Sequence, residues 1–280
     1  MNSPITRIGG KKLLRKHICE RFPAEGTFDR YVEVFGGAGW VLFYKDRHAP
    51  LEVYNDVDGQ LVNLMRCIKY HAAELQRELD GCCNAREFFE DAAAQLDMRG
   101  LTDIQRAARY FLRMKISFGA DNKTYGCNIK NLGNAINYLS DVQVRLMKSS
   151  VVIEHKDFEN LIKVYDRPAA LFYCNPPYHS AEKYYDVPFG EADHIRLRDT
   201  LANIKGKFLL SYNDDDFVHE LYNNFKIEAV ERGNNLSGGK FKELIIWCDF
   251  TAFLLVVKLL KIVHSVQIAS KFLTLTFYQC

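Results

Sequence analysis

Short apolar runs of strand length alternate with helix-length segments in the second half of the chain, and this alternation constrains the fold most. The runs are "VVIE" (151–154), "ALFYC" (170–174), "KFLLSY" (207–212), "FKIEAV" (225–230) and "ELIIWC" (243–248). Helix-length segments lie near 157–165, 191–204 and 214–222. Apolar strands joined by helices are typical of a mostly parallel sheet that is covered on both faces. The sequence therefore predicts a three-layer α/β fold.

The first 70 residues add a βαβ unit to this sheet. A strand-like run, "YVEVF" (31–35), ends at the glycine turn "GGAG", after which we expect the apolar "WVLFYKD" (40–46) to form a helix. A second run, "LEVYN" (51–55), precedes "GQLVNLMRCIKY" (59–70), whose apolar residues have helical spacing.

Residues 71–148 are mainly helical in pattern, and we interpret them as an inserted helical subdomain. The chain is thus divided into one α/β domain in two halves (1–70 and 149–250), the insert (71–148) and an apolar C-terminal extension (251–280). Lysines interrupt the extension before any apolar run reaches the ~20 residues of a membrane helix, so we expect no membrane partner.

Composition limits the class of protein, its partners and its compartment, but it does not select a function. A chain of 280 residues that is 48% hydrophobic is long enough for a sizeable core, and a formal net charge of +2 neither demands nor excludes a polyanionic partner. The eight cysteines contain no C-x-x-C pair, and the N-terminus lacks the apolar core of a signal peptide, which favours reduced thiols in a cytoplasm. The scattered histidines predict no metal site.

Glycines and a carboxylate near the first two strands suit a nucleotide-like ligand. Gly37 and Gly39 let the backbone approach a ligand closely, but Leu42 stands where a dinucleotide fingerprint has its third glycine, which disfavours NAD. Asp56, at the end of the second strand, either binds the hydroxyls of a cofactor ribose or caps the next helix. "RIGGKK" (7–12) is not a phosphate-binding loop, although Lys11 supplies a cation for a carboxylate or phosphate.

The run "ALFYC" ends in Asn175-Pro176-Pro177-Tyr178, and two successive prolines make this strand end rigid. Open α/β sheets bind ligands at such carboxyl ends. The Asn175 side-chain oxygen and the Pro176 carbonyl can each accept one N–H of a planar amino group, while the Tyr178 ring stacks on a base taken out of a duplex. Two acceptors draw the amino nitrogen towards tetrahedral geometry, which makes it a better nucleophile for methyl transfer.

Together these motifs resemble the Dam-type family of DNA adenine-N6 methyltransferases, which use S-adenosylmethionine. The resemblance rests on an ordered set that reaches about residue 250: "GGK" (9–11), "EVFGGAGW" (33–40), "YNDVDGQLVNL" (54–64), "YCNPPY" (173–178) and "LSGGKFKELIIW" (236–247). It implies a Rossmann-like methyltransferase fold whose helical insert recognises the target. It also implies a bacterial or phage-encoded protein that acts on double-stranded DNA in the cytoplasm, and we expect a monomer.

The resemblance implies a role for each matching residue. The cofactor-binding residues would be Arg7, Lys11, Glu33, Phe35, Gly37, Gly39, Asp56 and Asn175, and the catalytic residues Asn175, Pro176, Pro177 and Tyr178. Two positions depart from the family pattern: Arg7 stands where an aromatic is usual, and Asn175 where aspartate is usual. An amide oxygen is still an acceptor, so we expect activity to survive the second change.

The stretch "KISFGADNKTYGCNIK" (115–130) of the insert offers side chains to phosphates and base edges. The candidate DNA-binding residues are Lys115, Asn122, Lys123, Tyr125, Asn128 and Lys130. Asn-Pro-Pro-Tyr serves any planar amino or amide nitrogen, so cytosine-N4, RNA and protein-glutamine methylation remain alternatives. A non-catalytic DNA-binding protein with a degenerate methyltransferase fold is a further one.

Overall fold

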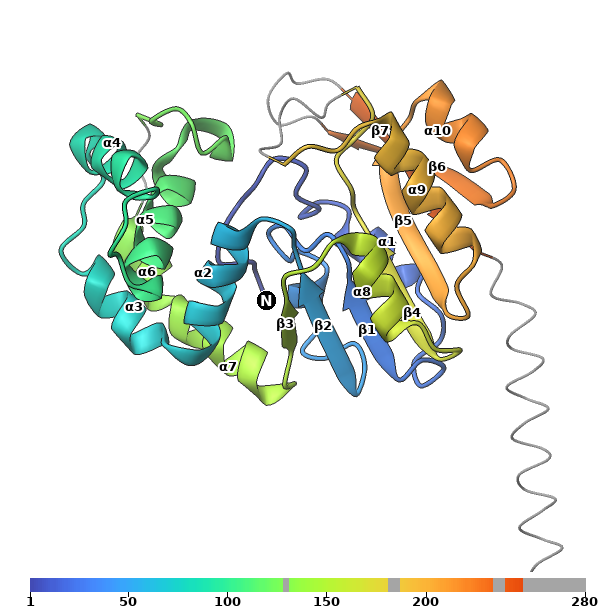
Figure 1. Ribbon diagram of the computed structural model, residues 1–280, viewed down its shortest axis with the longest axis horizontal. Helices are drawn as coiled ribbons and strands as arrows, with labels where there is room; N and C mark the ends of the chain where they lie inside the picture. The colour runs from blue at the N-terminus through green and yellow to red at the C-terminus, as the bar shows by residue number, and fades with distance from the viewer. Residues whose placement is uncertain (128–130, 181–186, 234–239, 249–280) are drawn as a thin grey trace, which may run out of the picture. The chain divides into compact units, whose positions relative to one another are not determined.

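The computed structural model describes residues 1–127, 131–180, 187–233 and 240–248. Within these residues, a seven-stranded sheet has the order β3-β2-β1-β4-β5-β7-β6 (Figure 1). The strands are β1 (Arg30–Glu33), β2 (Leu51–Asn55), β3 (Val152–Glu154), β4 (Ala170–Cys174), β5 (Lys207–Asn213), β6 (Lys226–Gly233) and β7 (Lys240–Trp247). Neighbours from β3 to β5 pair in parallel, whereas β7 is antiparallel to both β5 and β6. The prediction of a mostly parallel, Rossmann-like sheet is confirmed.

The strand order changes direction between β1 and β4, and this point locates the site. Chain connections from β1 lead towards β2 and β3, and those from β4 lead towards β5, so the loops that follow β1 and β4 diverge at the carboxyl edge. Open α/β sheets bind their ligands in the crevice that such a divergence leaves. Glu33 pairs in register with Tyr173, which places the glycine turn after β1 beside Asn175 after β4.

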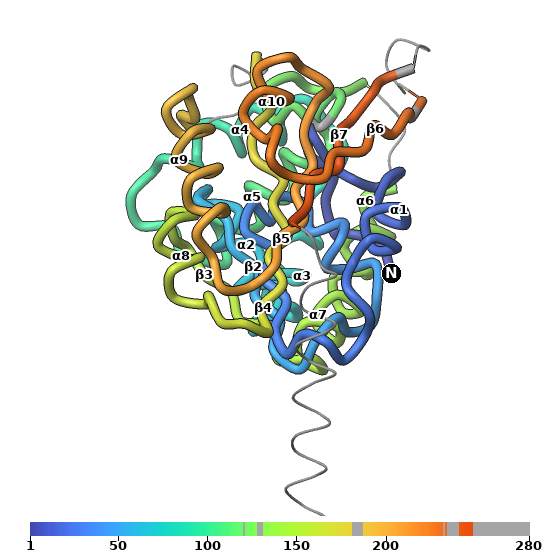
Figure 2. Tube along the Cα trace, turned by 90° about the vertical axis from the view of Figure 1, so that its right-hand side faces the viewer, coloured from blue at the N-terminus to red at the C-terminus, as the bar shows by residue number. Residues whose placement is uncertain are grey.

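Helices cover both faces of the sheet. The helices are α1 (Arg15–Glu20), α2 (Gly59–Tyr70), α3 (Ala72–Leu79), α4 (Arg86–Gln95), α5 (Asp103–Ile116), α6 (Leu132–Asn137), α7 (Leu139–Lys148), α8 (Phe158–Tyr165), α9 (Glu191–Ala202) and α10 (Asp216–Leu221), with short 3-10 helices η1 (Leu42–Tyr44) and η2 (Phe118–Ala120). The views in Figure 1 and Figure 2 place α8 and α9 on one face and α1 on the other. Helices α2 to α7 form a group beside β3 (Figure 1).

The helical group is centred on α5, which packs against α2, α3 and α4. Its start is set locally, because Thr102 and Gln105 form a reciprocal capping box. At the other end of the group, α7 carries a buried arginine, Arg145, whose Nη1 lies 2.9 Å from Oε2 of Glu52 on β2. Residues Met1–Trp247 form one compact unit, and the boundaries at 70 and 148 within it stay predictions.

The expected helix over 40–46 is wrong. Only the short η1 (Leu42–Tyr44) forms there. Val41, Leu42 and Phe43 are all buried, and a run buried on consecutive positions lacks the spacing of a one-sided helix. The chain must also reach β2 by Leu51, which leaves little length for a helix. The glycine turn is therefore followed by one short 3-10 helix, not by an α-helix whose dipole could face a ligand.

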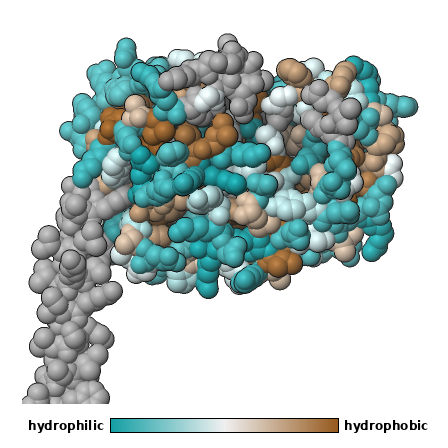
Figure 3. Space-filling model, turned by 180° about the vertical axis from the view of Figure 1, so that it is seen from behind, coloured by the Kyte–Doolittle hydropathy of each residue, from teal (hydrophilic) through white to brown (hydrophobic). Residues whose placement is uncertain are grey.

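Seen from behind, the described surface is largely hydrophilic with small apolar areas (Figure 3). No described helix combines the length and apolar character needed to cross a membrane. The extension 251–280 lies outside the described residues.

Candidate active site

Three glycines after β1 let the turn fold closely against β2. A Cβ added to Gly36 would lie 2.3 Å from a ring atom of Tyr54, so no larger residue fits there. Gly37 and Gly39 have φ angles of 50° and 70°, in the left-handed region that glycine tolerates. The N–H of Gly37 donates to Oδ2 of Asp56 at 2.7 Å. The two parts of the predicted cofactor site, glycine turn and carboxylate, are therefore in direct contact.

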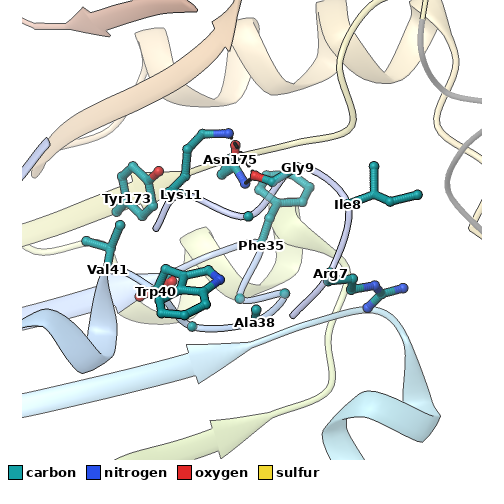
Figure 4. A pocket seen from close by; sticks show the side chains of 15 residues that line it. Arg7, Ile8, Gly9, Lys11, Phe35, Ala38, Trp40, Val41, Tyr173 and Asn175 are labelled. Carbon is teal, nitrogen blue, oxygen red and sulfur yellow. Dashed lines mark hydrogen bonds between the residues drawn. The ribbon is translucent and has the colours of Figure 1, made fainter. Parts of the chain in front are cut away.

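Two adjoining pockets open around this turn, with empty volumes of about 300 and 570 Å³. Both are lined by Arg7, Ile8, Phe35, Gly37 and Asn175. In the smaller one, Arg7 and Ile8 lie on the opposite side from Tyr173 and Val41 (Figure 4). The structure brings all the predicted cofactor residues to these pockets: Lys11, Glu33 and Gly39 line the smaller one and Asp56 the larger one.

Two aromatic residues, Phe35 and Phe189, line the larger pocket, and Phe158 packs against both of them. The ring centroid of Phe35 lies 5.6 Å from that of Phe158 and 5.8 Å from that of Phe189. Phe189 lines the pocket together with Pro177. Sequence reasoning missed Phe158, Phe189 and Gly36. The two phenylalanines come from separate elements with no shared local motif, whereas the adjacent glycines had already marked the turn.

Asp56 is held in place by backbone groups. Its Oδ1 accepts the N–H of Asp58 at 2.9 Å, and burial raises its pKa while Arg7 and the two N–H groups oppose that shift. Asp58 itself is the N-cap of α2, so Asp56 is not the capping residue. A second contact links this region to the helical group: Oδ2 of Asp58 receives both Nη2 of Arg7 and the hydroxyl of Tyr110, each at 2.9 Å.

Asn175 is oriented by a chain of hydroxyl groups. Its Oδ1 accepts the hydroxyl of Ser211 at 3.1 Å, and its Nδ2 donates to the Gly9 carbonyl at 3.4 Å. Because the one proton of Ser211 is used in this way, the Tyr173 hydroxyl, 3.0 Å away, must donate to Ser211. An amide oxygen has two lone pairs, so Oδ1 keeps one for another donor.

Tyr178 is nearly buried, at 6% exposure. Its hydroxyl contacts Lys11 and Glu243, both at 2.6 Å. Lys11 also donates to the Gly9 carbonyl at 2.9 Å, and Figure 4 shows Lys11 and Asn175 converging there. Lys11 therefore lines the smaller pocket while its ammonium points to Tyr178. Sequence reasoning missed Glu243, which lies far along the chain from both partners.

The predicted DNA-binding residues have different surroundings. Nζ of Lys115 donates to the Pro4 carbonyl at 3.0 Å, and the Tyr125 hydroxyl contacts Asn84 Oδ1 at 3.2 Å. Lys123 is exposed. Asn122 lines a cleft with an empty volume of about 1250 Å³. Asn128 and Lys130 lie outside the described residues.

The cleft lies between the helical group and the carboxyl edge of the sheet. Its lining carries three arginines and an equal number of aspartates: Arg66, Arg106, Arg113, Asp58, Asp97 and Asp103. Val57 and Val187 line both the cleft and the larger pocket, so the two spaces adjoin. Among the residues that the structure describes, no cluster of three or more His, Cys, Asp or Glu side chains is placed to hold a metal ion.

The buried carboxyl of Glu33 is expected to make the stability depend on pH. Burial raises its pKa from 4.5 to about 8, although the Tyr31 hydroxyl donates to it. Between these values the folded state keeps a proton that the unfolded chain has lost, so the free energy of unfolding falls as pH rises from about 4.5 to about 8. We expect Glu33→Gln to flatten this fall, as measured by urea unfolding at several pH values. An unchanged slope would contradict the prediction.

Comparison with known proteins now identifies the family. The model of the D12 class N6 adenine-specific DNA methyltransferases matches residues 8–235. The chain belongs to this family. It is 22% identical over 228 residues to the type II methyltransferase M.CviBI of Paramecium bursaria Chlorella virus NC1A, covering 78% of this chain and 85% of that protein.

Two further relatives match over similar lengths. Type II methyltransferase M.MjaIII of Methanocaldococcus jannaschii is 25% identical over 280 residues, covering 84% of this chain and 93% of the relative. The DNA adenine methylase of Haemophilus influenzae is 25% identical over 268 residues, covering 85% and 90%. The predicted function, a DNA adenine-N6 methyltransferase that uses S-adenosylmethionine, is confirmed by family membership. The alternatives of cytosine, RNA or protein methylation are not supported.

Proposed function

We propose that this methyltransferase acts on an adenine that is rotated out of double-stranded DNA at a specific sequence, and that Asn175 and Pro176 hold its N6 amino group. One observation carries the proposal: Asn175 directly follows β4 at the point where the strand order changes direction, and it lines both pockets beside the glycine turn. The amino group and the cofactor are thereby brought together at one residue.

The residues that line the two pockets suit the parts of S-adenosylmethionine. Asp56 offers carboxylate oxygens to the ribose hydroxyls, and Phe35 and Phe189 offer an apolar wall to the adenine ring. The smaller pocket, lined by Glu33 and Gly39, suits the methionine part. When bound, the cofactor supplies the electrophilic methyl group.

The protein contributes orientation and acceptors. Ser211 fixes the amide of Asn175, so the remaining lone pair of Oδ1 has a defined direction. The Pro176 carbonyl is the second acceptor, and the following Pro177 restricts the backbone that carries it. Two N–H bonds draw the amino group out of conjugation, and its proton leaves after methyl transfer has made the nitrogen cationic. No strong general base is required for this sequence of events.

The cleft beside the helical group supports binding of DNA. Arg66 and Arg113 are cations on its wall, and Asn122 offers both a donor and an acceptor. The cleft adjoins the larger pocket, so an extruded base has a short path to Asn175. Lys123, exposed on the neighbouring loop, suits a phosphate contact.

Incubation with labelled S-adenosylmethionine and mixed-sequence duplex DNA tests this function. We expect N6-methyladenine in DNA, identified by mass spectrometry of the nucleosides. Label in RNA or protein with unlabelled DNA would contradict it, as would 4-methylcytosine. Specificity is tested by methylation-sensitive sequencing of DNA from host cells that express either the wild type or Tyr178→Ala. We expect one short methylated sequence in the cells with the wild type and none in the cells with the variant. Methylated adenines that share no sequence would refute specificity.

A further inference from the structure

Lys11 and Glu243 form a buried ion pair, and both side chains also contact the Tyr178 hydroxyl. Nζ of Lys11 lies 3.3 Å from Oε2 of Glu243, and the two side chains are 3% and 1% exposed. Both groups lie 2.6 Å from the oxygen of Tyr178. Lys11 lies near the start of the chain, Tyr178 in the segment after β4, and Glu243 on β7.

The direction of each hydrogen bond follows from the chemistry. A lysine ammonium only donates, so the Tyr178 oxygen accepts from Lys11 and its single proton goes to the Glu243 carboxylate. The ammonium also lies 4.6 Å from the centroid of the Tyr178 ring. The tip of the ring is thus held on two sides, and a charged partner makes each bond stronger than a neutral one.

Sheet topology explains how Glu243 reaches this place. Strand β7 is antiparallel to β5, and Glu243 pairs with Asn213, the last residue of β5. The residue therefore lies at the carboxyl edge, where β4 ends in the Asn-Pro-Pro-Tyr motif. It also lies beyond residues 8–235, which the family model matches.

We propose that Glu243 is a positioning residue for methyl transfer, and that it acts through Lys11 and Tyr178 by holding the Tyr178 ring where the extruded base stacks. The proposal rests on the proposed function, since it presupposes a base beside Tyr178. It also assigns Lys11 an indirect part, because its ammonium donates to Tyr178 and to the Gly9 carbonyl and pairs with Glu243. Removing the Glu243 charge would take this ion pair from the buried Lys11 ammonium and one of the two charged contacts from the ring tip.

Glu243→Gln tests the proposal in single-turnover methylation at saturating cofactor and DNA, with calorimetric titration of S-adenosylmethionine. We expect methyl transfer to slow roughly 10- to 100-fold and the cofactor Kd to stay within about twofold. Glu228→Gln is the matched control, because Glu228 lies on the adjacent strand β6 and pairs with Arg21. We expect neither quantity to change in the control.

Tyr178→Phe keeps the ring and the ion pair but removes the hydroxyl through which Glu243 acts. In this background, Glu243→Gln should slow transfer by less than about threefold. A wild-type rate for Glu243→Gln, an equal loss of cofactor affinity, or full additivity with Tyr178→Phe would each overturn the proposal. Should Glu243→Gln fail to fold, Tyr178→Phe alone decides: slowed transfer with unchanged Kd supports the proposal and a wild-type rate overturns it. Failure of the proposed function is a separate result, in which the wild type itself yields no N6-methyladenine.

Discussion

Replacing Asn175 with alanine is expected to slow methyl transfer roughly 100- to 1,000-fold, with a change of less than about threefold in the affinity for S-adenosylmethionine. The substitution removes the side-chain acceptor for the target amino group and leaves the Ser211 hydroxyl without its partner at Asn175. Asn175 is one of many residues that line the two pockets, so cofactor binding should persist. Single-turnover methylation and calorimetric titration measure the two quantities separately.

Asn175→Asp is the matched control for this prediction. A carboxylate keeps an acceptor at the same position and still receives the Ser211 hydroxyl, so we expect a transfer rate within about tenfold of the wild type. Ser211→Ala should have an intermediate effect, because it leaves the acceptor present but less well oriented. Equal losses of rate and cofactor affinity in Asn175→Ala would argue against placing the amino group at this residue.

Asp56→Asn is expected to weaken cofactor binding roughly 10- to 100-fold. The carboxylate accepts the N–H groups of Gly37 and Asp58, one at each oxygen. An amide has only one acceptor oxygen, so its NH₂ group would face one of these donors and would also be a poorer partner for two ribose hydroxyls. Calorimetry measures the Kd, and at saturating cofactor the transfer rate should stay within about threefold of the wild type.

Asp166→Asn is the control for a purely structural effect. The Asp166 carboxylate also accepts two backbone N–H groups, from Lys205 and Gly206, but it precedes β4 and so lies at the opposite edge of the sheet. We expect it to lower stability without weakening cofactor binding. Unchanged affinity in Asp56→Asn would show that the ribose is not held at Asp56.

Local patterns predicted the strands well. The runs at 51–55 and 170–174 coincide with β2 and β4, because both are of strand length, contain aromatic and aliphatic residues, and are bounded by turn residues. The segment 40–46 shows the limit of this reasoning. Its apolar composition is compatible with a helix. In the structure, however, the successive residues Val41, Leu42 and Phe43 are all buried in the core, and only η1 forms.

The candidate site divides in the same way. Gly37, Asp56 and Asn175 were predicted because each lies in the turn that follows a strand, where parallel topology gathers residues at one edge. Phe158, Phe189 and Ser211 were not, because each depends on how a distant helix or strand packs beside that edge. Lys115 shows a further limit: its phosphate contact stays a prediction, and only the folded chain showed that its ammonium donates to the Pro4 carbonyl.

The sequence by itself determined the α/β class, the order of the motifs and the strand ends at which ligand-binding residues stand, since these follow from periodicity and turn chemistry along adjacent residues. Only the tertiary structure decided which distant groups meet there. Lys11 and Glu243 come together because β7 returns antiparallel beside β5, and a pairing of this kind leaves no trace in the residues that flank either one. The rigid loop after β4 could thus be predicted from the sequence, whereas the contacts that orient Asn175 and Tyr178 could not.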